Sequence, residues 1–143
     1  MASVVVDASV MVALYVEEEM SAPARAALLR AHEDGHDLHA PDLITVEFAN
    51  ALWKRVGRGE LGRDSAMAAL GALANLDDLD RHPLDAQLVL PALSLAIAHS
   101  LTAYDALYAA LAVQLGGTVI TSDRRFAERG LEAGLPVAAV PAE

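Results

Sequence analysis

The stretch Ser3-Val4-Val5-Val6-Asp7-Ala8-Ser9 decides the fold of this chain. Its consecutive β-branched valines predict a short, buried strand. Asp7, Ala8 and Ser9 then supply capping residues ahead of an apolar helical run that reaches Val16. A strand that feeds directly into a helix indicates an α/β protein, with Asp7 at the carboxyl end of the strand.

Short extended segments alternate with helices along the rest of the chain. We expect further strands at residues 37–40, 118–121 and 136–140, the last at a sheet edge. Helices are expected at residues 21–32, 41–56, 63–76, 84–99, 101–115 and 122–129. Pro91 should break or kink the segment 84–99, so two helical pieces are expected there. This order predicts a three-layer α/β/α sandwich with a mainly parallel central sheet.

The composition is typical of one globular domain. The 143 residues are 55% hydrophobic, enough to close one core, so a single domain is expected over residues 1–143. There is no cysteine, which excludes disulfides and thiolate metal sites and favours a reducing, cytoplasmic location. The start lacks the basic region of a signal peptide, and no stretch reaches the roughly 20 apolar residues of a membrane span. No membrane association is expected.

The formal net charge of −10 argues against nucleic-acid binding, because affinity for a phosphate backbone depends on lysine and arginine. Lys54 is the only lysine. Most arginines, however, fall into two local groups: Arg55, Arg58 and Arg63 in one, and Arg124, Arg125 and Arg129 in the other. These groups can form basic patches on an acidic body. The alternative is that both are solvated surface charge.

Four acids occupy positions where an α/β fold places its chemistry. Asp7 and Asp123 each follow a predicted strand, and the carboxyl ends of parallel strands meet at one edge of the sheet. Glu47 lies within the apolar run 43–49, and Asp105 lies in the first turn of an otherwise apolar helix. Acids in apolar surroundings are costly unless they are paired or bind a cation. Oxygen ligands without cysteine or suitably spaced histidine favour Mg²⁺ or Mn²⁺.

Each acid also has a structural interpretation. Asp7 and Asp123 can be helix N-caps, and Thr102 with Asp105 three residues later is close to a capping box. Glu47 can pair with an arginine or face solvent. The case for a site rests on the four acids occurring together and in order.

Four segments that contain these acids resemble the successive acidic motifs of PIN domains, and the last two resemble VapC toxins in particular. The segments are Val4-Val5-Val6-Asp7-Ala8-Ser9, Glu47-Phe48-Ala49-Asn50-Ala51-Leu52, Leu101-Thr102-Ala103-Tyr104-Asp105-Ala106-Leu107-Tyr108 and Val119-Ile120-Thr121-Ser122-Asp123-Arg124-Arg125-Phe126. Any one of these motifs alone is weak. All four in order are specific, and the resemblance covers essentially the whole chain.

The resemblance implies an α/β/α endoribonuclease that uses Mg²⁺ or Mn²⁺ to hydrolyse RNA phosphodiester bonds. Carried over residue by residue, the metal-binding and catalytic acids are Asp7, Glu47, Asp105 and Asp123. Ser9 matches a hydroxyl residue that orients the first acid, and Asn50 and Ser122 match supporting polar positions. Arg55, Arg58, Arg124 and Arg125 are the candidate RNA contacts.

The resemblance also implies partners and a reaction outcome. Such proteins are the toxin component of a VapBC-type toxin-antitoxin pair, held inactive by a VapB-type antitoxin whose C-terminal segment lies across the site, and they commonly form homodimers. Attack by water leaves 5′-phosphate and 3′-hydroxyl products. Which RNA is cut, and whether one or two metal ions take part, stays open.

Two other interpretations compete. His32-Glu33-Asp34-Gly35-His36 formally matches the H-E-x-x-H motif of zinc metallopeptidases. That motif needs both histidines on one helical face, whereas Asp34-Gly35 indicates a turn between them. The second alternative is a catalytically inactive PIN-like interaction domain, which would keep the fold without the chemistry.

Overall fold

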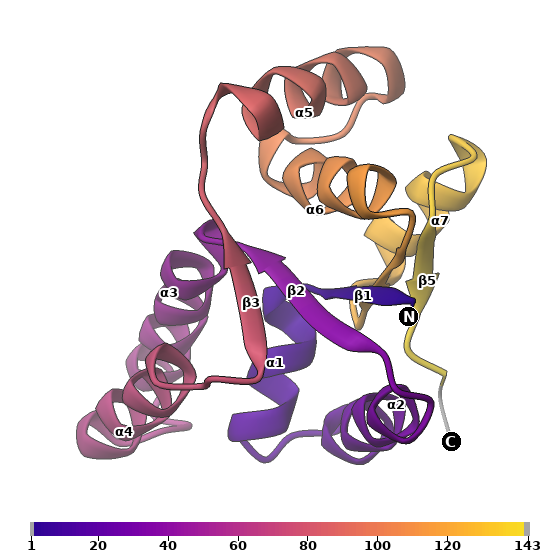
Figure 1. Ribbon diagram of the computed structural model, residues 1–143. Helices are drawn as coiled ribbons and strands as arrows, with labels where there is room; N and C mark the ends of the chain where they lie inside the picture. The colour runs from indigo at the N-terminus through magenta and orange to yellow at the C-terminus, as the bar shows by residue number, and fades with distance from the viewer. Residues whose placement is uncertain (1, 142–143) are drawn as a thin grey trace.

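The computed structural model describes residues 2–141, so Met1 and residues 142–143 of the expected domain lie outside the described part (Figure 1). Helices and strands alternate as an α/β fold requires. In chain order they are β1 (Ser3–Val6), α1 (Ala8–Tyr15), α2 (Ser21–Glu33), β2 (Asp37–Pro41), α3 (Leu43–Gly57), α4 (Arg63–Ala74), β3 (Leu79–His82), α5 (Ala86–His99), α6 (Ala103–Leu115), β4 (Thr118–Thr121), α7 (Arg124–Glu132) and β5 (Val137–Ala139).

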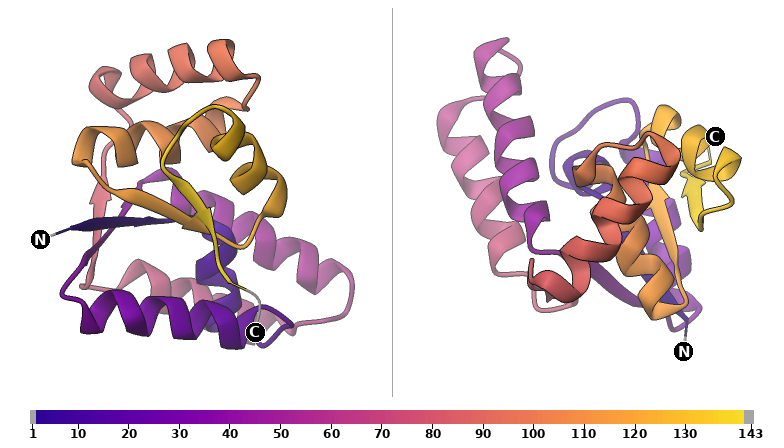
Figure 2. Two further views of the ribbon diagram at one scale, coloured as in Figure 1. Left: turned by 90° about the vertical axis from the view of Figure 1, so that its right-hand side faces the viewer. Right: turned by 90° about the horizontal axis from the view of Figure 1, so that it is seen from above.

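The sheet has five strands in the order β3-β2-β1-β4-β5, and every described pairing is parallel. The central strand β1 is buried on both faces, since Val4 and Val6 pack with α1 to α4 whereas Val5 packs with α5 to α7. Figures 1 and 2 show these two helical layers on opposite sides of the sheet. The expected three-layer sandwich is confirmed. From β1 the strands are added on one side as β2 and β3, and then on the other side as β4 and β5. Such folds bind ligands at this switch in strand order beside β1.

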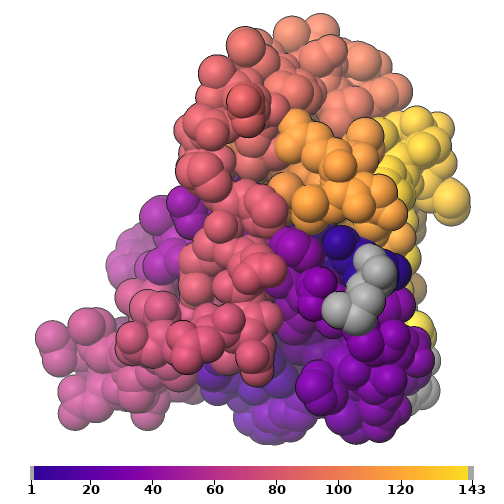
Figure 3. Space-filling view, in the orientation of Figure 1, coloured from indigo at the N-terminus to yellow at the C-terminus, as the bar shows by residue number. Residues whose placement is uncertain are grey.

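Helices α3 and α4 pack against each other and extend away from the sheet as an arm (Figure 2). The space-filling view shows this arm projecting from the body at the lower left (Figure 3). Only the inner side of α3 is buried, through Ile44, Phe48 and Leu52. The outer side is therefore free to form the wall of a pocket.

Strand β3 was not expected from the sequence. Of its residues Leu79-Asp80-Arg81-His82, only Leu79 is buried, so it lacks the apolar pattern of an internal strand. Its position depends on backbone pairing with β2 and on the Arg81 guanidinium, which donates to the Leu73 carbonyl at the end of α4. An edge strand held by these bonds can carry polar side chains.

The expected break at Pro91 is wrong, because α5 runs without interruption from Ala86 to His99. A proline inside a helix leaves the carbonyl four residues earlier without its donor. Here that carbonyl belongs to Gln87, and the Gln114 side chain of α6 donates to it at 2.7 Å. The neighbouring helix thus replaces the hydrogen bond that Pro91 removes.

Helix α5 packs against α6 on one side and carries exposed apolar residues on the other. The exposed set is Val89, Leu90, Leu93 and Ile97. Within residues 2–141, no single helix has the length and apolar content needed to cross a membrane. In this part of the chain, only α5 and α6 taken together have that length and apolar content, and they are bent by 114° relative to each other.

The repair of Pro91 predicts an interaction between two substitutions. Gln114→Ala should lower the free energy of unfolding by about 1 kcal/mol, because the Gln87 carbonyl loses its donor. In a Pro91→Ala background the backbone N–H restored at position 91 can bond that carbonyl, so the same change should cost little. Urea unfolding of the wild type, both single variants and the double variant tests this. An equal cost in both backgrounds would contradict it.

Candidate active site

Asp7 lies directly after β1 and is buried, with 7% of its surface exposed. Ser9 Oγ donates to Asp7 Oδ1 at 2.5 Å, and the Val10 N–H donates to the same oxygen at 3.2 Å. Thr121 Oγ1 donates to the other oxygen, Oδ2. Asp7 therefore caps α1, as its structural interpretation requires, and is also held rigidly at the carboxyl edge of the sheet. The expected orienting contact of Ser9 is present.

Thr121 links the ends of β1 and β4, a position that the sequence pattern did not single out. The register pairs Val6 with Ile120, which places Thr121 beside Asp7. Besides donating to Asp7, Thr121 Oγ1 accepts the Asp123 N–H at 2.9 Å. Thr121 looked like an ordinary strand residue. The only available signal was a hydroxyl two residues before an acid.

Asp123 and Asp105 both lie at helix starts. The Asp123 carboxylate caps α7 by accepting the N–H groups of Arg125 at 3.0 Å and Phe126 at 3.3 Å. Asp105 donates its N–H to Thr102 Oγ1 at 3.1 Å, which is one half of the expected capping box. Both structural interpretations are thus correct, and neither prevents the carboxylates from serving a site, because each retains free oxygen lone pairs.

Glu47 lies on α3 and is partly buried. The Tyr108 hydroxyl of α6 donates to Glu47 Oε1 at 2.6 Å. Tyr108 is itself 2% exposed. It belongs to the third of the four acidic motifs, but the sequence pattern indicated no role for it. Its hydrogen bond joins the helical layers on the two faces of the sheet.

The acids act on one another electrostatically. Burial raises the pKa of Asp7 from 3.8 to about 6, and the nearby charge of Asp123 adds to the rise. Burial likewise raises the pKa of Asp105 to about 6, helped by Asp123 and Glu47. Burial also raises the pKa of Glu47. Each of the four carboxyls is therefore close enough to at least one of the others to affect, or be affected by, its ionisation.

The donor set at this cluster fits a hard divalent cation. All four side chains offer carboxylate oxygens, and within residues 2–141 none of them forms an ion pair. As they stand in the described part of the chain, no three histidine or acidic side chains are grouped closely enough to hold one metal ion. To bind one ion, the partly exposed Asp105 and the exposed Asp123 would have to close inward by side-chain rotation.

A pocket of about 740 Å³ opens beside the acids, and we call it the α3 pocket. Its lining comes from α1, the loop before α2, α3 and the starts of α6 and α7. The residues are Ala8, Ser9, Val12, Glu18, Met20, Leu43, Val46, Glu47, Asn50, Ala51, Lys54, Arg55, Tyr104, Ser122 and Asp123. Glu47 and Asp123 line the pocket, whereas Asp7 and Asp105 are not part of its lining. The expected supporting residues Asn50 and Ser122 both line it.

Ser122 is placed by its backbone, since its N–H donates to Ser9 Oγ at 2.9 Å. Its own hydroxyl oxygen is buried and, among the described residues, has no hydrogen-bond partner. A buried hydroxyl without a partner is costly, so a ligand in the pocket would gain from bonding to it.

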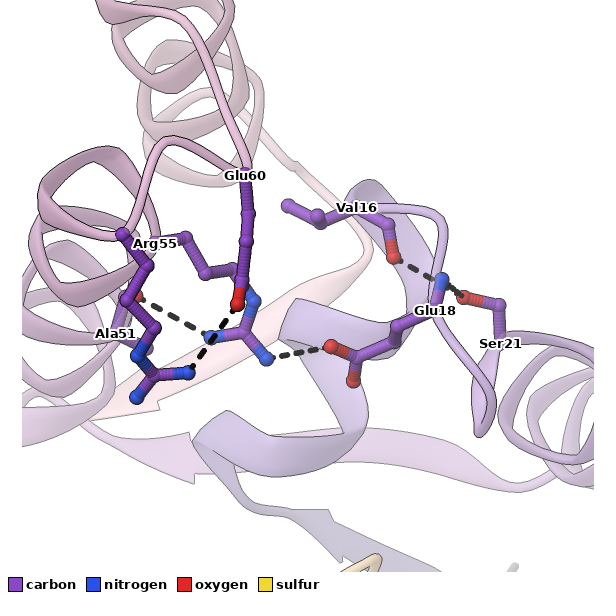
Figure 4. Close-up of polar contacts among 7 residues, drawn as sticks. Val16, Glu18, Ser21, Ala51, Arg55 and Glu60 are labelled. Atoms are coloured by element: carbon purple, nitrogen blue, oxygen red, sulfur yellow. Dashed lines mark hydrogen bonds and ion pairs between the residues drawn. The ribbon is translucent and has the colours of Figure 1, made fainter.

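Arg55, one of the candidate RNA contacts, is held in an ion pair (Figure 4). Its Nη2 lies 2.5 Å from Glu18 Oε2, and its Nη1 donates to the Ala51 carbonyl at 3.2 Å. Glu18 is placed by Ser21, whose Oγ accepts the Glu18 N–H and donates to the Val16 carbonyl. The charge of Arg55 is therefore largely balanced inside the protein.

The other candidate arginines are exposed. Arg58, at the end of α3, has its Nη1 3.8 Å from Glu60 Oε1, and Arg124 and Arg125 lie in the first turn of α7. Arg124 and Arg125 directly follow Asp123, so they flank the acids. Arg124 and Arg125 are thus nearer to the acids than Arg58 is.

The histidine motif is not arranged as in a metallopeptidase. Helix α2 ends at Glu33, and Gly35 adopts a left-handed conformation with φ 74°. His32 and His36 consequently do not share a helical face, which the motif requires.

Comparison with known proteins agrees with the fold. The PIN domain model matches residues 4–131. Ribonuclease VapC3 of Pyrobaculum aerophilum is 42% identical over 125 residues, covering 87% of this chain and 92% of the relative. Ribonuclease VapC1 of Mycobacterium tuberculosis is 36% identical over 104 residues, covering 73% of this chain and 76% of the relative.

The crystal structure of VapBC2 from Rickettsia felis, bound to a DNA fragment from the promoter, has the same fold with a TM-score of 0.71. The alignment covers 97% of this chain and 99% of that chain, at 12% identity. Because the family model spans most of the sequence and a curated ribonuclease shares more than a third of its residues, the chain belongs to the PIN-domain family and, within it, to the VapC ribonucleases.

Proposed function

We propose that this protein is a metal-dependent endoribonuclease and the toxin of a VapBC-type pair, acting in the cytoplasm as one nuclease domain. The observation that supports the proposal is the electrostatic coupling of Asp7, Asp105 and Glu47 through neighbouring acids, with the pKa of Asp7 and of Asp105 raised to about 6. An acidic cluster of this kind is unfavourable by itself and is stabilised by a bound cation.

In the proposed site Asp7, Asp105, Asp123 and Glu47 hold Mg²⁺ or Mn²⁺. When bound, the ion supplies a Lewis acid that activates water and offsets the charge developing on the phosphodiester. Ser9 and Thr121 keep Asp7 oriented through their hydrogen bonds. The α3 pocket receives the RNA strand, with the exposed Lys54 in its lining and the exposed Arg124 and Arg125 directly after the lining residue Asp123. Water attack yields a 5′-phosphate and a 3′-hydroxyl.

The proposed antitoxin is of the VapB type. The related fold of the Rickettsia felis complex and the family of the chain support this pairing. The α3 pocket supports it physically, because a cationic side chain of a partner can enter between Glu47 and Asp123 when metal and RNA are excluded.

The exposed face of α5 supports a homodimer. Helix α5 has no charged residue, and its outward residues Val89, Leu90, Leu93 and Ile97 are each more than 40% exposed. A second copy offers the same apolar face, and a two-fold axis can bring the two faces together.

Ribonuclease activity should require both the metal and the acids. Purified protein should cleave RNA with Mg²⁺ or Mn²⁺, and EDTA should abolish cleavage. Asp7→Asn should reduce kcat by about 100-fold or more, since it removes a charge at the centre of the cluster. Arg30→Ala, on the far helix α2, is the matched control. Cleavage that survives both EDTA and Asp7→Asn would eliminate the metal-dependent mechanism, whereas no cleavage under any of these conditions would favour the inactive PIN-like interaction domain.

Asp105→Asn should stabilise the metal-free protein while weakening metal binding. An acid whose pKa is higher in the folded state binds more protons when folded, so its contribution to stability is lost as pH rises from about 4 to about 6. At pH 7 in EDTA the variant should gain on the order of 1 kcal/mol, allowing for the partial exposure of Asp105. Thermal melts with EDTA and with Mn²⁺ measure both effects. A variant less stable than wild type in EDTA would refute the electrostatic argument.

Disrupting the α5 face should separate the dimer. Leu90→Glu and Ile97→Glu each place a charge on the apolar face and should shift the molar mass in light scattering from dimer to monomer. Leu131→Glu is the control, because Leu131 is 77% exposed on α7, away from that face. Dimers that persist in both α5 variants would exclude this face as the interface.

A further inference from the structure

Tyr108 is the most deeply placed polar side chain that faces the acids from the α6 side. It is 2% exposed, and its ring belongs to the apolar core between α6 and the sheet. Only its hydroxyl reaches the site, where it donates to Glu47 Oε1 at 2.6 Å. A buried phenol ring is rigid, so this donor is fixed in position relative to the sheet.

Among residues 2–141, no other side chain forms a hydrogen bond or ion pair with the Glu47 carboxylate. Its carboxylate lies at the end of a flexible side chain on α3, the arm that extends away from the sheet. Asp7, by contrast, is held on both oxygens by Ser9, Val10 and Thr121. Without the Tyr108 hydroxyl, Glu47 would be free to turn outward into the α3 pocket.

The chemistry of the donor matters as well as its position. A lysine or arginine at position 108 would cancel part of the negative charge that attracts a cation. A phenol directs one oxygen of Glu47 and leaves the charge of the carboxylate intact. The hydroxyl also lies within the electrostatic reach of Asp7 and Asp105, so the donor is central to the cluster.

We infer that Tyr108 is a positioning residue, which holds one oxygen of Glu47 so that the other is presented to the divalent cation shared with Asp7, Asp105 and Asp123. This inference rests on the proposed metal site. In this role, the buried Tyr108 hydroxyl of α6 helps to assemble metal ligands that come from different parts of the fold.

The test is a double-mutant cycle read out as Mn²⁺ affinity without RNA, measured by calorimetry or by the electron paramagnetic resonance signal of free Mn²⁺. Tyr108→Phe should weaken Mn²⁺ binding about tenfold, the usual effect of removing a hydrogen bond that orients a metal ligand. Glu47→Gln should weaken it as well. In the Glu47→Gln background, Tyr108→Phe should have no further effect, because the group it positions no longer binds the ion strongly.

Tyr15→Phe is the matched control. Tyr15 packs edge-on against Phe48 in the opposite core, and losing its hydroxyl should leave Mn²⁺ affinity unchanged. Thermal melts in EDTA check that the variants fold. Raising the Mn²⁺ concentration should restore RNA cleavage by Tyr108→Phe, which a general packing defect would not allow.

The outcomes distinguish failure of the proposed metal site from failure of the positioning role of Tyr108. If the wild type binds no Mn²⁺, or Glu47→Gln binds it as tightly as the wild type, the proposed ligand set is wrong and the role of Tyr108 falls with it. If Glu47→Gln weakens binding but Tyr108→Phe does not, or if the two effects add in full, the metal site stands and the positioning role is refuted.

Discussion

The structure depends on one buried carboxylate, that of Asp7, held at the end of a strand that is covered on both faces. Val5 and Val6 are fully buried, so β1 cannot shift its register without moving valines between two cores. The pairing of Val6 with Ile120 then places Thr121 beside Asp7, and the hydroxyl network from Ser9 to Asp123 follows from that placement. The geometry of the site is therefore set by the core of the protein.

This arrangement has an energetic cost that the proposed cation would offset. Hydrogen bonds to Asp7 favour its charged form, yet burial outweighs them and its pKa still rises. The pKa of Asp105 is raised by burial and by two neighbouring acids, which the hydrogen bond with Thr102 and the charge of Arg129 offset only in part. The protein thus keeps local instability at the proposed site, a common feature of active sites.

Much of the fold could be predicted because the relevant signals are local. The valine strand, the capping residues and the apolar helices each follow from short-range patterns. Strand β3 could not be predicted, since its polar residues at a sheet edge carry no hydrophobic signal. The predicted break at Pro91 was wrong for a related reason. The donor that replaces the lost hydrogen bond, Gln114, lies 27 residues after Gln87 on another helix. Thr121 and Tyr108 likewise act through partners distant in the chain, which no spacing rule reveals.

The ion pair between Arg55 and Glu18 has a consequence for how a polyanion would experience this surface. Of the two basic residues that line the α3 pocket, only Lys54 is outside the ion pairs of residues 2–141. Binding of a single strand releases counterions in proportion to the phosphates neutralised, with a logarithmic slope of about −0.7 for each. Contacts within the pocket therefore neutralise only about one phosphate. This corresponds to roughly a threefold loss of affinity for the strand between 50 and 200 mM salt. Selectivity in this pocket must then come from shape and hydrogen bonding, which persist at the ionic strength of a cell.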